Sequence, residues 1–152
     1  MSGAEPSPVV KRHAFLERLQ EAQRQLLEPG LKSFTAAPGE YLAREGEPAH
    51  AFYLIQSGHV AIGTHLGERG AVPIQTVGPG DVVGWSWVVP PYRWQFDARA
   101  VDRVEGLFFE AAWLRELCEK NTTLGYQVLK QLIASISSRL AATRLQKLDV
   151  YG

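Results

Sequence analysis

Glycines divide the middle of the chain into short runs that are rich in β-forming residues. Phe52 to Ile55 and His59 to Ile62 are two such runs. Gln95 to Val101 alternates enough to form a later strand, and Val104 to Phe109 can form the next one. The glycines that separate these runs are Gly39, Gly46, Gly58, Gly67 and Gly70. Because glycine is a strong turn signal, this pattern predicts a series of short strands.

Helical patterns flank the region of short strands. Val9 to Leu27 carries apolar residues at helical spacing, and Leu31 to Phe34 is then expected to enter the sheet region as a strand. Glu110 to Glu119 is expected to form a short helix. Asn121 to Thr123 offers N-cap side chains for a longer helix over Leu124 to Leu148, which would be about 37 Å long.

Three of the four tryptophans lie within one segment, Gly80 to Arg99. The segment begins at the turn signal Gly78 to Asp81 and reaches Gly84 before the first indole. Gly84 has no Cβ, so the backbone there can approach another group closely. The three tryptophans are Trp85, Trp87 and Trp94.

The order of these segments resembles the cyclic-nucleotide-binding domain of the catabolite-activator and cyclic-nucleotide-dependent kinase family. The resemblance covers residues 14–148 and rests on several coinciding glycines and on the segment Gly80 to Gly84. It implies a mainly β fold with helices: a β-roll, of the double-stranded β-helix or jelly-roll type, over residues 31–109, with a helix before it and C-terminal helices over 110–148. We expect one domain over residues 9–152 and a mobile tail over residues 1–8, which are small, polar and proline-containing.

The resemblance also implies where a cyclic phosphate would bind. Family members grip it with the pattern Gly-Glu-Leu-Ala, followed further on by Pro-Arg-Ala-Ala/Thr. Here the glycine is Gly84, the glutamate position holds Trp85, and the phosphate-binding arginine falls on Trp94. An indole has one N–H donor and no acceptor, so it replaces neither the glutamate nor the bidentate arginine. The resemblance therefore implies a degenerate phosphate-binding cassette that does not bind cAMP in the family manner.

Three functions remain open for this segment. In the first, the domain is a sensor for a small planar or apolar ligand, because the indoles offer stacking faces and nearby side chains offer polar contacts. In the second, Trp85 and Trp94 fill the space themselves, and the domain is a ligand-free dimeric protein-interaction module. In the third, Arg93 and Thr143 support an atypical cyclic-nucleotide site. The candidate pocket consists of Gly84, Trp85, Ser86, Trp87, Arg93, Trp94, Gln95 and Thr143.

In the family, the helix that corresponds to Leu124 to Leu148 pairs with its symmetry mate. A wide apolar stripe runs along it here, which favours a homodimer, although a strict heptad does not persist because Arg139, Thr143 and Lys147 fall on seam positions. The alternative is that the stripe only covers the roll of its own subunit. An unknown protein partner is also possible. The candidate interface residues are Leu129, Leu132, Ile133, Ile136 and Leu140.

Composition and termini narrow the remaining function classes. Sixteen basic residues balance 16 acidic ones, so no global field attracts nucleic acid. Only four residues follow Leu148, where family transcription regulators continue into a helix-turn-helix, so we expect no DNA binding by this chain alone. No signal peptide or bilayer-length apolar run is present, and we expect a cytoplasmic protein with no membrane association.

The sequence offers no constellation for catalysis or metal binding. Cys118 is the only cysteine and is expected to be a buried, unreactive thiol. The histidines, His13, His50, His59 and His65, lack the close spacing of a cupin metal site. We therefore expect a protein that is not an enzyme, with no metal and no certain cofactor, although a cyclic nucleotide or another small planar ligand remains possible.

Overall fold

Two four-stranded antiparallel sheets form the centre of the molecule, a computed structural model that describes residues 13–65 and 71–151. In chain order the strands are β1 (Lys32–Ala36), β2 (Tyr41–Ala43), β3 (Ala51–Ser57), β4 (Val60–His65), β5 (Ala71–Val77), β6 (Val82–Val83), β7 (Asp97–Ala100) and β8 (Val104–Glu110). One sheet has the order β1-β8-β3-β6 and the other β2-β7-β4-β5. The predicted β-roll with flanking helices is confirmed.

Strand β3 shows how the roll is packed. Its residues Ala51 to Ile55 are all fully buried, whereas a strand with one face in water would alternate. Tyr53 and Ile55 point into the roll, and Phe52 and Leu54 belong to a second apolar cluster shared with the helices. Successive side chains of a strand point to opposite faces, so this strand separates two cores.

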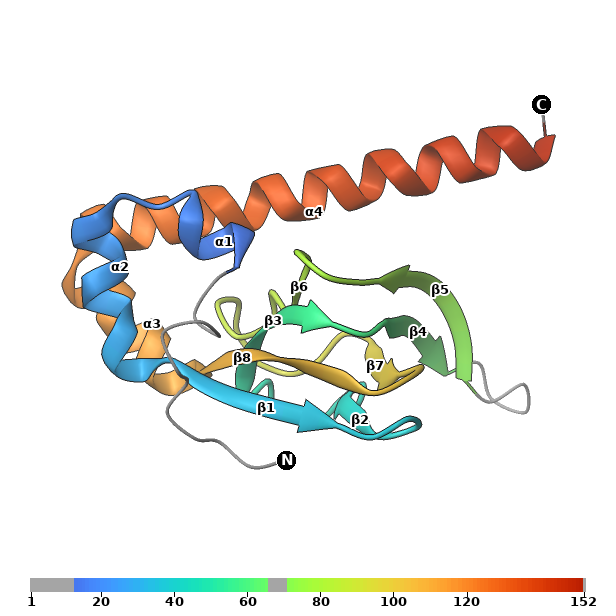
Figure 1. The fold of residues 1–152 in the computed structure, drawn as a ribbon, viewed down its shortest axis with the longest axis horizontal. Helices are drawn as coiled ribbons and strands as arrows, with labels where there is room; N and C mark the ends of the chain where they lie inside the picture. The colour runs from blue at the N-terminus through green and yellow to red at the C-terminus, as the bar shows by residue number, and fades with distance from the viewer. Residues whose placement is uncertain (1–12, 66–70, 152) are drawn as a thin grey trace.

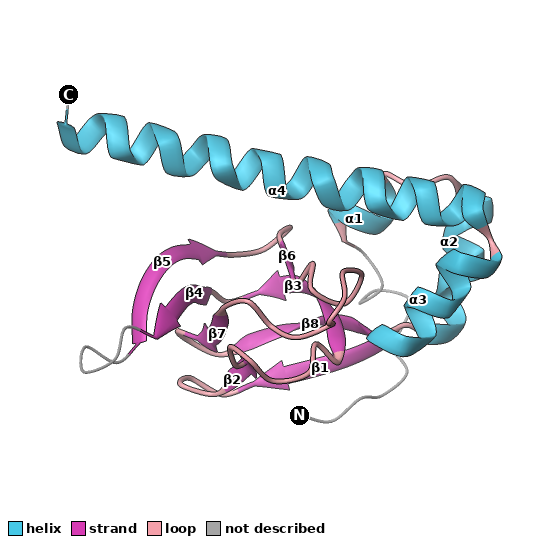
Figure 2. Cartoon of the chain, turned by 180° about the vertical axis from the view of Figure 1, so that it is seen from behind, coloured by secondary structure: helices cyan, strands magenta, loops and turns pink. Residues whose placement is uncertain are grey.

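The helices gather mainly at one end of the roll, and the last one runs along it. They are α1 (Ala14–Glu17), α2 (Glu21–Leu27), α3 (Ala111–Lys120) and α4 (Thr122–Tyr151), with a 3-10 turn at Glu28–Gly30. Helix α4 begins at the predicted cap, because Asn121 Oδ1 accepts a hydrogen bond from the Leu124 N–H at 3.1 Å. It lies beside the roll and extends past β5 (Figure 1), and the view from behind shows the other helices at its N-terminal end (Figure 2).

The single N-terminal helix predicted over Val9 to Leu27 is wrong in its described part, because two short helices replace it. His13 Nδ1 accepts from the Phe15 N–H at 3.0 Å and caps α1, and a capping box at Gln20 starts α2. Arg24 donates to carbonyl groups at the end of α1, including that of Leu16 at 3.4 Å. These side-chain bonds satisfy backbone groups that the break at residues 18–20 exposes.

Some sequence predictions fall outside the described residues. The expected tail over 1–8 is one, and the expected turn at Gly67 to Gly70 is another; the strands on either side of that turn do pair, with Ile62 opposite Gln75. Within residues 13–65 and 71–151, no helix has both the length and the apolar character required to cross a bilayer.

Candidate functional site

The tryptophan segment places its three indoles in three different environments. Trp87 is fully buried in the cluster shared with the helices, with its ring 5.5 Å from that of Phe52. Trp94 is 1% exposed and lies inside the roll, stacked at 6.5 Å on Tyr53. Trp85 is only partly buried and contacts Phe96, with ring centroids 6.5 Å apart. Of the three indoles, only Trp85 retains an accessible surface beside a cavity.

Gly84 lies directly against the buried Trp94. Its φ is +105°, a left-handed backbone conformation that side chains disfavour. A Cβ at this position would lie 2.8 Å from the indole of Trp94, closer than any ordinary contact. The ring of Trp94 therefore occupies the space beside Gly84, where the resemblance would place a phosphate.

A crevice of about 200 Å³ remains between the roll and α4. Two of its walls are strands, because Ile62 of β4 pairs with Gln75 of β5. The third wall is α4, whose residues Ile136 and Arg139 lie three apart and so share a face. The complete lining consists of Ile62, Ile74, Gln75, Trp85, Phe96, Ile136 and Arg139. The crevice is mostly apolar and carries one cationic side chain.

Arg139 is held at the edge of the apolar wall. Burial lowers the pKa of its guanidinium, and the negative charge of Asp81 raises that pKa in part. Arginine remains charged at neutral pH in either case. The side-chain amide of Gln75 donates to the backbone carbonyl of Arg139 at 3.2 Å, which ties β5 to α4. This hydrogen bond fixes the backbone of the helix beside the strand that it faces.

The fold and its comparisons agree on one family. A model of the cyclic nucleotide-binding domain matches residues 34–121. The chain belongs to the cyclic nucleotide-binding domain family. A cyclic nucleotide-binding protein from Geobacter metallireducens is 25% identical over 84% of this chain and 92% of its own, with a TM-score of 0.75.

Two regulator domains are also similar to this cyclic nucleotide-binding domain. The sensor domain of the transcriptional regulator DNR from Pseudomonas aeruginosa is 25% identical, covers 85% of this chain and 87% of its own, and has a TM-score of 0.64. The N-terminal domain of a transcriptional regulator from Streptomyces coelicolor is 20% identical over 97% of this chain and 96% of its own, with a TM-score of 0.64. At 20% identity, the similarity to the Streptomyces domain shows only that the two proteins share a fold.

The structure of this cyclic nucleotide-binding domain separates the predicted pocket residues. Arg93 is exposed and donates to the Gly46 carbonyl at 2.9 Å, away from the crevice. Gln95 is also exposed and donates to the Arg93 carbonyl at 3.1 Å. Ser86 is buried, and its hydroxyl has no hydrogen-bond partner within the described structure. Of the eight candidate residues, only Trp85 lines the crevice, while the side chain of Thr143 lies outside the described set.

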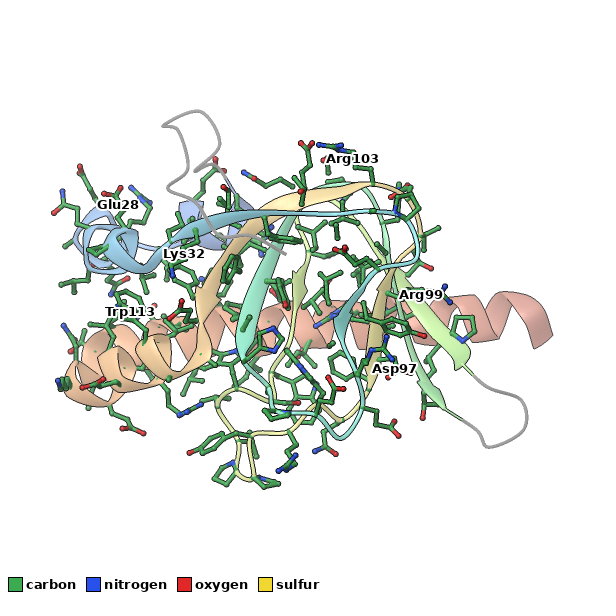
Figure 3. The ribbon with its side chains drawn as sticks, turned by 90° about the horizontal axis from the view of Figure 1, so that it is seen from below. Glu28, Lys32, Asp97, Arg99, Arg103 and Trp113 are labelled. Atoms are coloured by element: carbon green, nitrogen blue, oxygen red, sulfur yellow. The ribbon has the colours of Figure 1, made fainter. Side chains whose placement is uncertain are left out.

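The acidic residue of β7 does not line the crevice either. Asp97 is buried and accepts a hydrogen bond from the Glu45 N–H at 2.8 Å. Arg99, two residues further along the same strand, is exposed and donates to the Gly39 carbonyl at 2.9 Å. Figure 3 shows both side chains on this strand. The carboxylate of Asp97 thus supports the neighbouring loop that contains Glu45.

The candidate interface residues of α4 differ in how much of each side chain is exposed. Leu132 is only 2% exposed and belongs to the core of its own subunit, so its side chain leaves little surface for a partner. Leu129 and Ile136 pack against that core and are partly buried. Ile133 is 62% exposed and is open to a partner. The side chain of Leu140 falls outside the described part.

A second, shallower groove of about 660 Å³ lies beside α3. Its charged side chains already have partners. Glu110 pairs with Lys32, and Arg115 donates to the Trp87 carbonyl at 2.7 Å and lies 4.0 Å from the ring centre of Tyr92. Arg115 therefore holds the tryptophan loop against α3. The groove is lined by Ala49, His50, Phe108, Glu110, Ala111, Ala112 and Arg115.

Sequence reasoning missed most of the crevice. Ile62, Ile74 and Gln75 come from strands whose register depends on long-range pairing, and no local motif marks them. Arg139 did leave a signal, because it interrupts an apolar stripe on the last helix. In the structure this arginine is part of the lining of the crevice.

Proposed function

We propose that this chain is a non-catalytic regulatory sensor domain that takes a small ligand in the crevice between the roll and α4, and not cAMP in the family manner. The observation that carries this proposal is the indole of Trp94, which occupies the space beside Gly84. By the family resemblance, the phosphate-binding arginine falls on this position, and an indole carries no charge with which to bind a phosphate.

The size of the crevice supports the same conclusion. Its volume of about 200 Å³ is smaller than the roughly 300–1,000 Å³ of sites that enclose drug-sized ligands. A cyclic nucleotide, with its fused base, ribose and phosphate, would need Trp85 or α4 to move. The lining contains one cationic side chain, Arg139, which comes from α4 and not from the loop on which the family carries its phosphate-binding arginine.

Protein-observed NMR of the four indole N–H groups tests this function, with a W85F variant to assign the resonance of Trp85. We expect the neutral one-ring compound benzyl alcohol to shift the Trp85 resonance, and cAMP and cyclic GMP to leave all four unchanged. A saturable response to cAMP would support the atypical nucleotide site instead. No response to any of the three compounds would favour a ligand-free interaction module.

We also propose that the domain forms a homodimer along α4. Tyr126 and Ile133 are 63% and 62% exposed and lie seven residues apart, which places them on one face of the helix. Leu129 and Ile136 stand at the intervening seam positions and are partly buried. The exposed apolar side chains on this face would be covered by the same face of a second copy.

Sedimentation of an I133E variant tests the dimer, with A134E as the matched control. Ala134 is exposed on the same turn but outside the seam. We expect the wild-type chain and A134E to be dimers and I133E to be a monomer. A wild-type monomer at all concentrations, or an I133E variant that still dimerises, contradicts an interface on this face.

A further inference from the structure

The buried side chain of His13 joins α1 to the turn that precedes β6. Its Nδ1 accepts a hydrogen bond from the Phe15 N–H at 3.0 Å, and its Nε2 lies 3.1 Å from the backbone carbonyl oxygen of Asp81. The first partner is a donor and the second is an acceptor, so both bonds form only when the ring is neutral and carries its proton on Nε2. We propose that this contact is acid-sensitive: protonation of His13 weakens the attachment of α1 to the roll, while the two sheets stay folded.

A second proton on the ring of His13 finds no acceptor. On Nδ1 it would point at the Phe15 N–H, so two donors would face each other and the cap of α1 would be lost. The site is also buried, which penalises a charged imidazolium and lowers the pKa of His13. A protonated ring is therefore expected to leave the site, and α1 then loses its cap and its hydrogen bond to the turn together.

The charged and polar groups that face His13 oppose this effect only in part. Glu17 on α1 and Asp81 in the turn bring negative charge, and these carboxylates raise the pKa of His13, as do the backbone groups of Asp81 and of Ile55 in β3. On the side of α4, the charge of Asp81 also acts on Arg139. Burial is the largest of the influences on His13, so the neutral ring is favoured while α1 is attached.

Helix α1 covers part of the apolar cluster between the roll and the helices. Phe15, Leu16 and the following Leu19 are buried in that cluster, and the ring of Phe15 lies 5.2 Å from that of Phe52. Figures 1 and 2 show α1 between α4 and the sheets. Trp85 packs against the same cluster, so its indole is expected to sense the detachment of α1.

The pH range of the effect follows from the two states of His13. In the detached state the ring is in water and has its ordinary pKa of 6.5, and in the attached state its pKa is lower. Attachment is therefore strongest above pH 6.5 and weakens as the pH falls below that value. Because one proton is taken up on detachment, the equilibrium constant for detachment rises by up to about tenfold per pH unit.

Hydrogen exchange of backbone amides, measured by NMR from about pH 7.5 to about pH 5, tests the inference in the whole chain. The amide of Arg18 donates to the Ala14 carbonyl and reports on α1. After correction for the intrinsic exchange rate, its protection factor should fall by up to about tenfold per pH unit below pH 6.5. Amides of β8, which lies between β1 and β3, should be more strongly protected than that of Arg18 at every pH, because α1 detaches without unfolding of the sheets.

Two variants separate His13 from other titrating groups. H13N keeps an oxygen that can accept from the Phe15 N–H but has no group that titrates in this range, so the protection of Arg18 should no longer depend on pH. H59N is the matched control, because His59 is exposed and its Nδ1 lies 2.8 Å from a carboxylate oxygen of Asp102. This variant should keep the pH dependence of the wild type.

The wild-type chain alone supplies a second readout if H13N does not hold α1 in place. The ring protons of His13 and the indole N–H of Trp85 should shift with the same midpoint, below pH 6.5. A Trp85 resonance that does not follow the titration of His13, or a protection factor of Arg18 that does not fall with pH, refutes the inference. So does the wild-type pH dependence in a folded H13N variant. Equal protection of Arg18 and β8 would show that the whole domain unfolds instead.

Discussion

Replacing Gly84 with alanine tests the central contact of the tryptophan segment. The new methyl group would meet two restrictions at once. The φ of +105° disfavours any side chain, and the Cβ would lie 2.8 Å from the ring of the buried Trp94. Neither the backbone nor an indole that is 1% exposed can move away without disturbing the interior of the roll.

The size of the effect follows from these two terms. A left-handed conformation costs a residue with a Cβ about 1–2 kcal/mol. Forcing extra volume into a packed core adds about 1–3 kcal/mol. We therefore expect G84A to lower the free energy of unfolding by about 2–5 kcal/mol, a large part of the stability of a small domain.

Gly80 supplies a matched control for the backbone term. Its φ is +89°, and a Cβ there would meet nothing within 4 Å. Urea unfolding should therefore show that G80A costs only the strain of about 1–2 kcal/mol. The difference between the two variants isolates the contact with Trp94.

A double-mutant cycle with W94A completes the test. W94A alone is expected to cost about 3–5 kcal/mol because it leaves a cavity. In that background the methyl group at position 84 has room, so its cost should fall to that of G80A. If G84A costs no more than G80A, or if its cost is the same with and without the indole, Trp94 does not fill the space beside Gly84 and the reasoning fails.

Two further predictions concern titratable groups. Burial lowers the pKa of His13 below its usual value of 6.5, so between the two pKa values the unfolded chain binds more protons than the folded chain. The free energy of unfolding therefore falls as the pH drops through 6.5, and thermal unfolding measured against pH should show this loss. The dependence of the melting temperature on pH should be shallower in H13N, whose amide oxygen can keep the cap on α1. An equal slope in H13N would assign the loss to other groups. Burial also raises the pKa of Cys118 from 9.0 to about 11, so thiol modification at about pH 8 should be roughly 100-fold slower in the folded chain than after denaturation. Equal rates would contradict a shielded thiol.

Local sequence signals predicted most of the fold. The strand at Val104 to Phe109 and the helix cap at Asn121 depend on neighbouring residues alone, and both lie within a residue or two of the expected place. The break between α1 and α2 was missed because it depends on the caps at His13 and Gln20 and on the reach of Arg24, which a pattern of apolar residues does not show.

The site was less predictable because its residues meet only through tertiary pairing. The segment around Gly84 was found from its tryptophans, but the crevice also needs β4, β5 and α4. The last helix illustrates the same limit. Leu132 and Ile133 are adjacent and both apolar, yet one is buried in the core and the other faces outward. A stripe of apolar residues this wide does not show which edge of it the roll will cover.

Ile136 connects the crevice with the proposed dimer interface on α4. It lines the crevice and also stands in the seam of the proposed dimer, so one side chain is shared by two binding equilibria. By thermodynamic linkage, any ligand that displaces this residue changes the dimer association constant by the same factor by which dimer formation changes the affinity for that ligand. The dissociation constant of the dimer, measured with and without benzyl alcohol, would therefore report whether a ligand occupies the proposed site in the crevice.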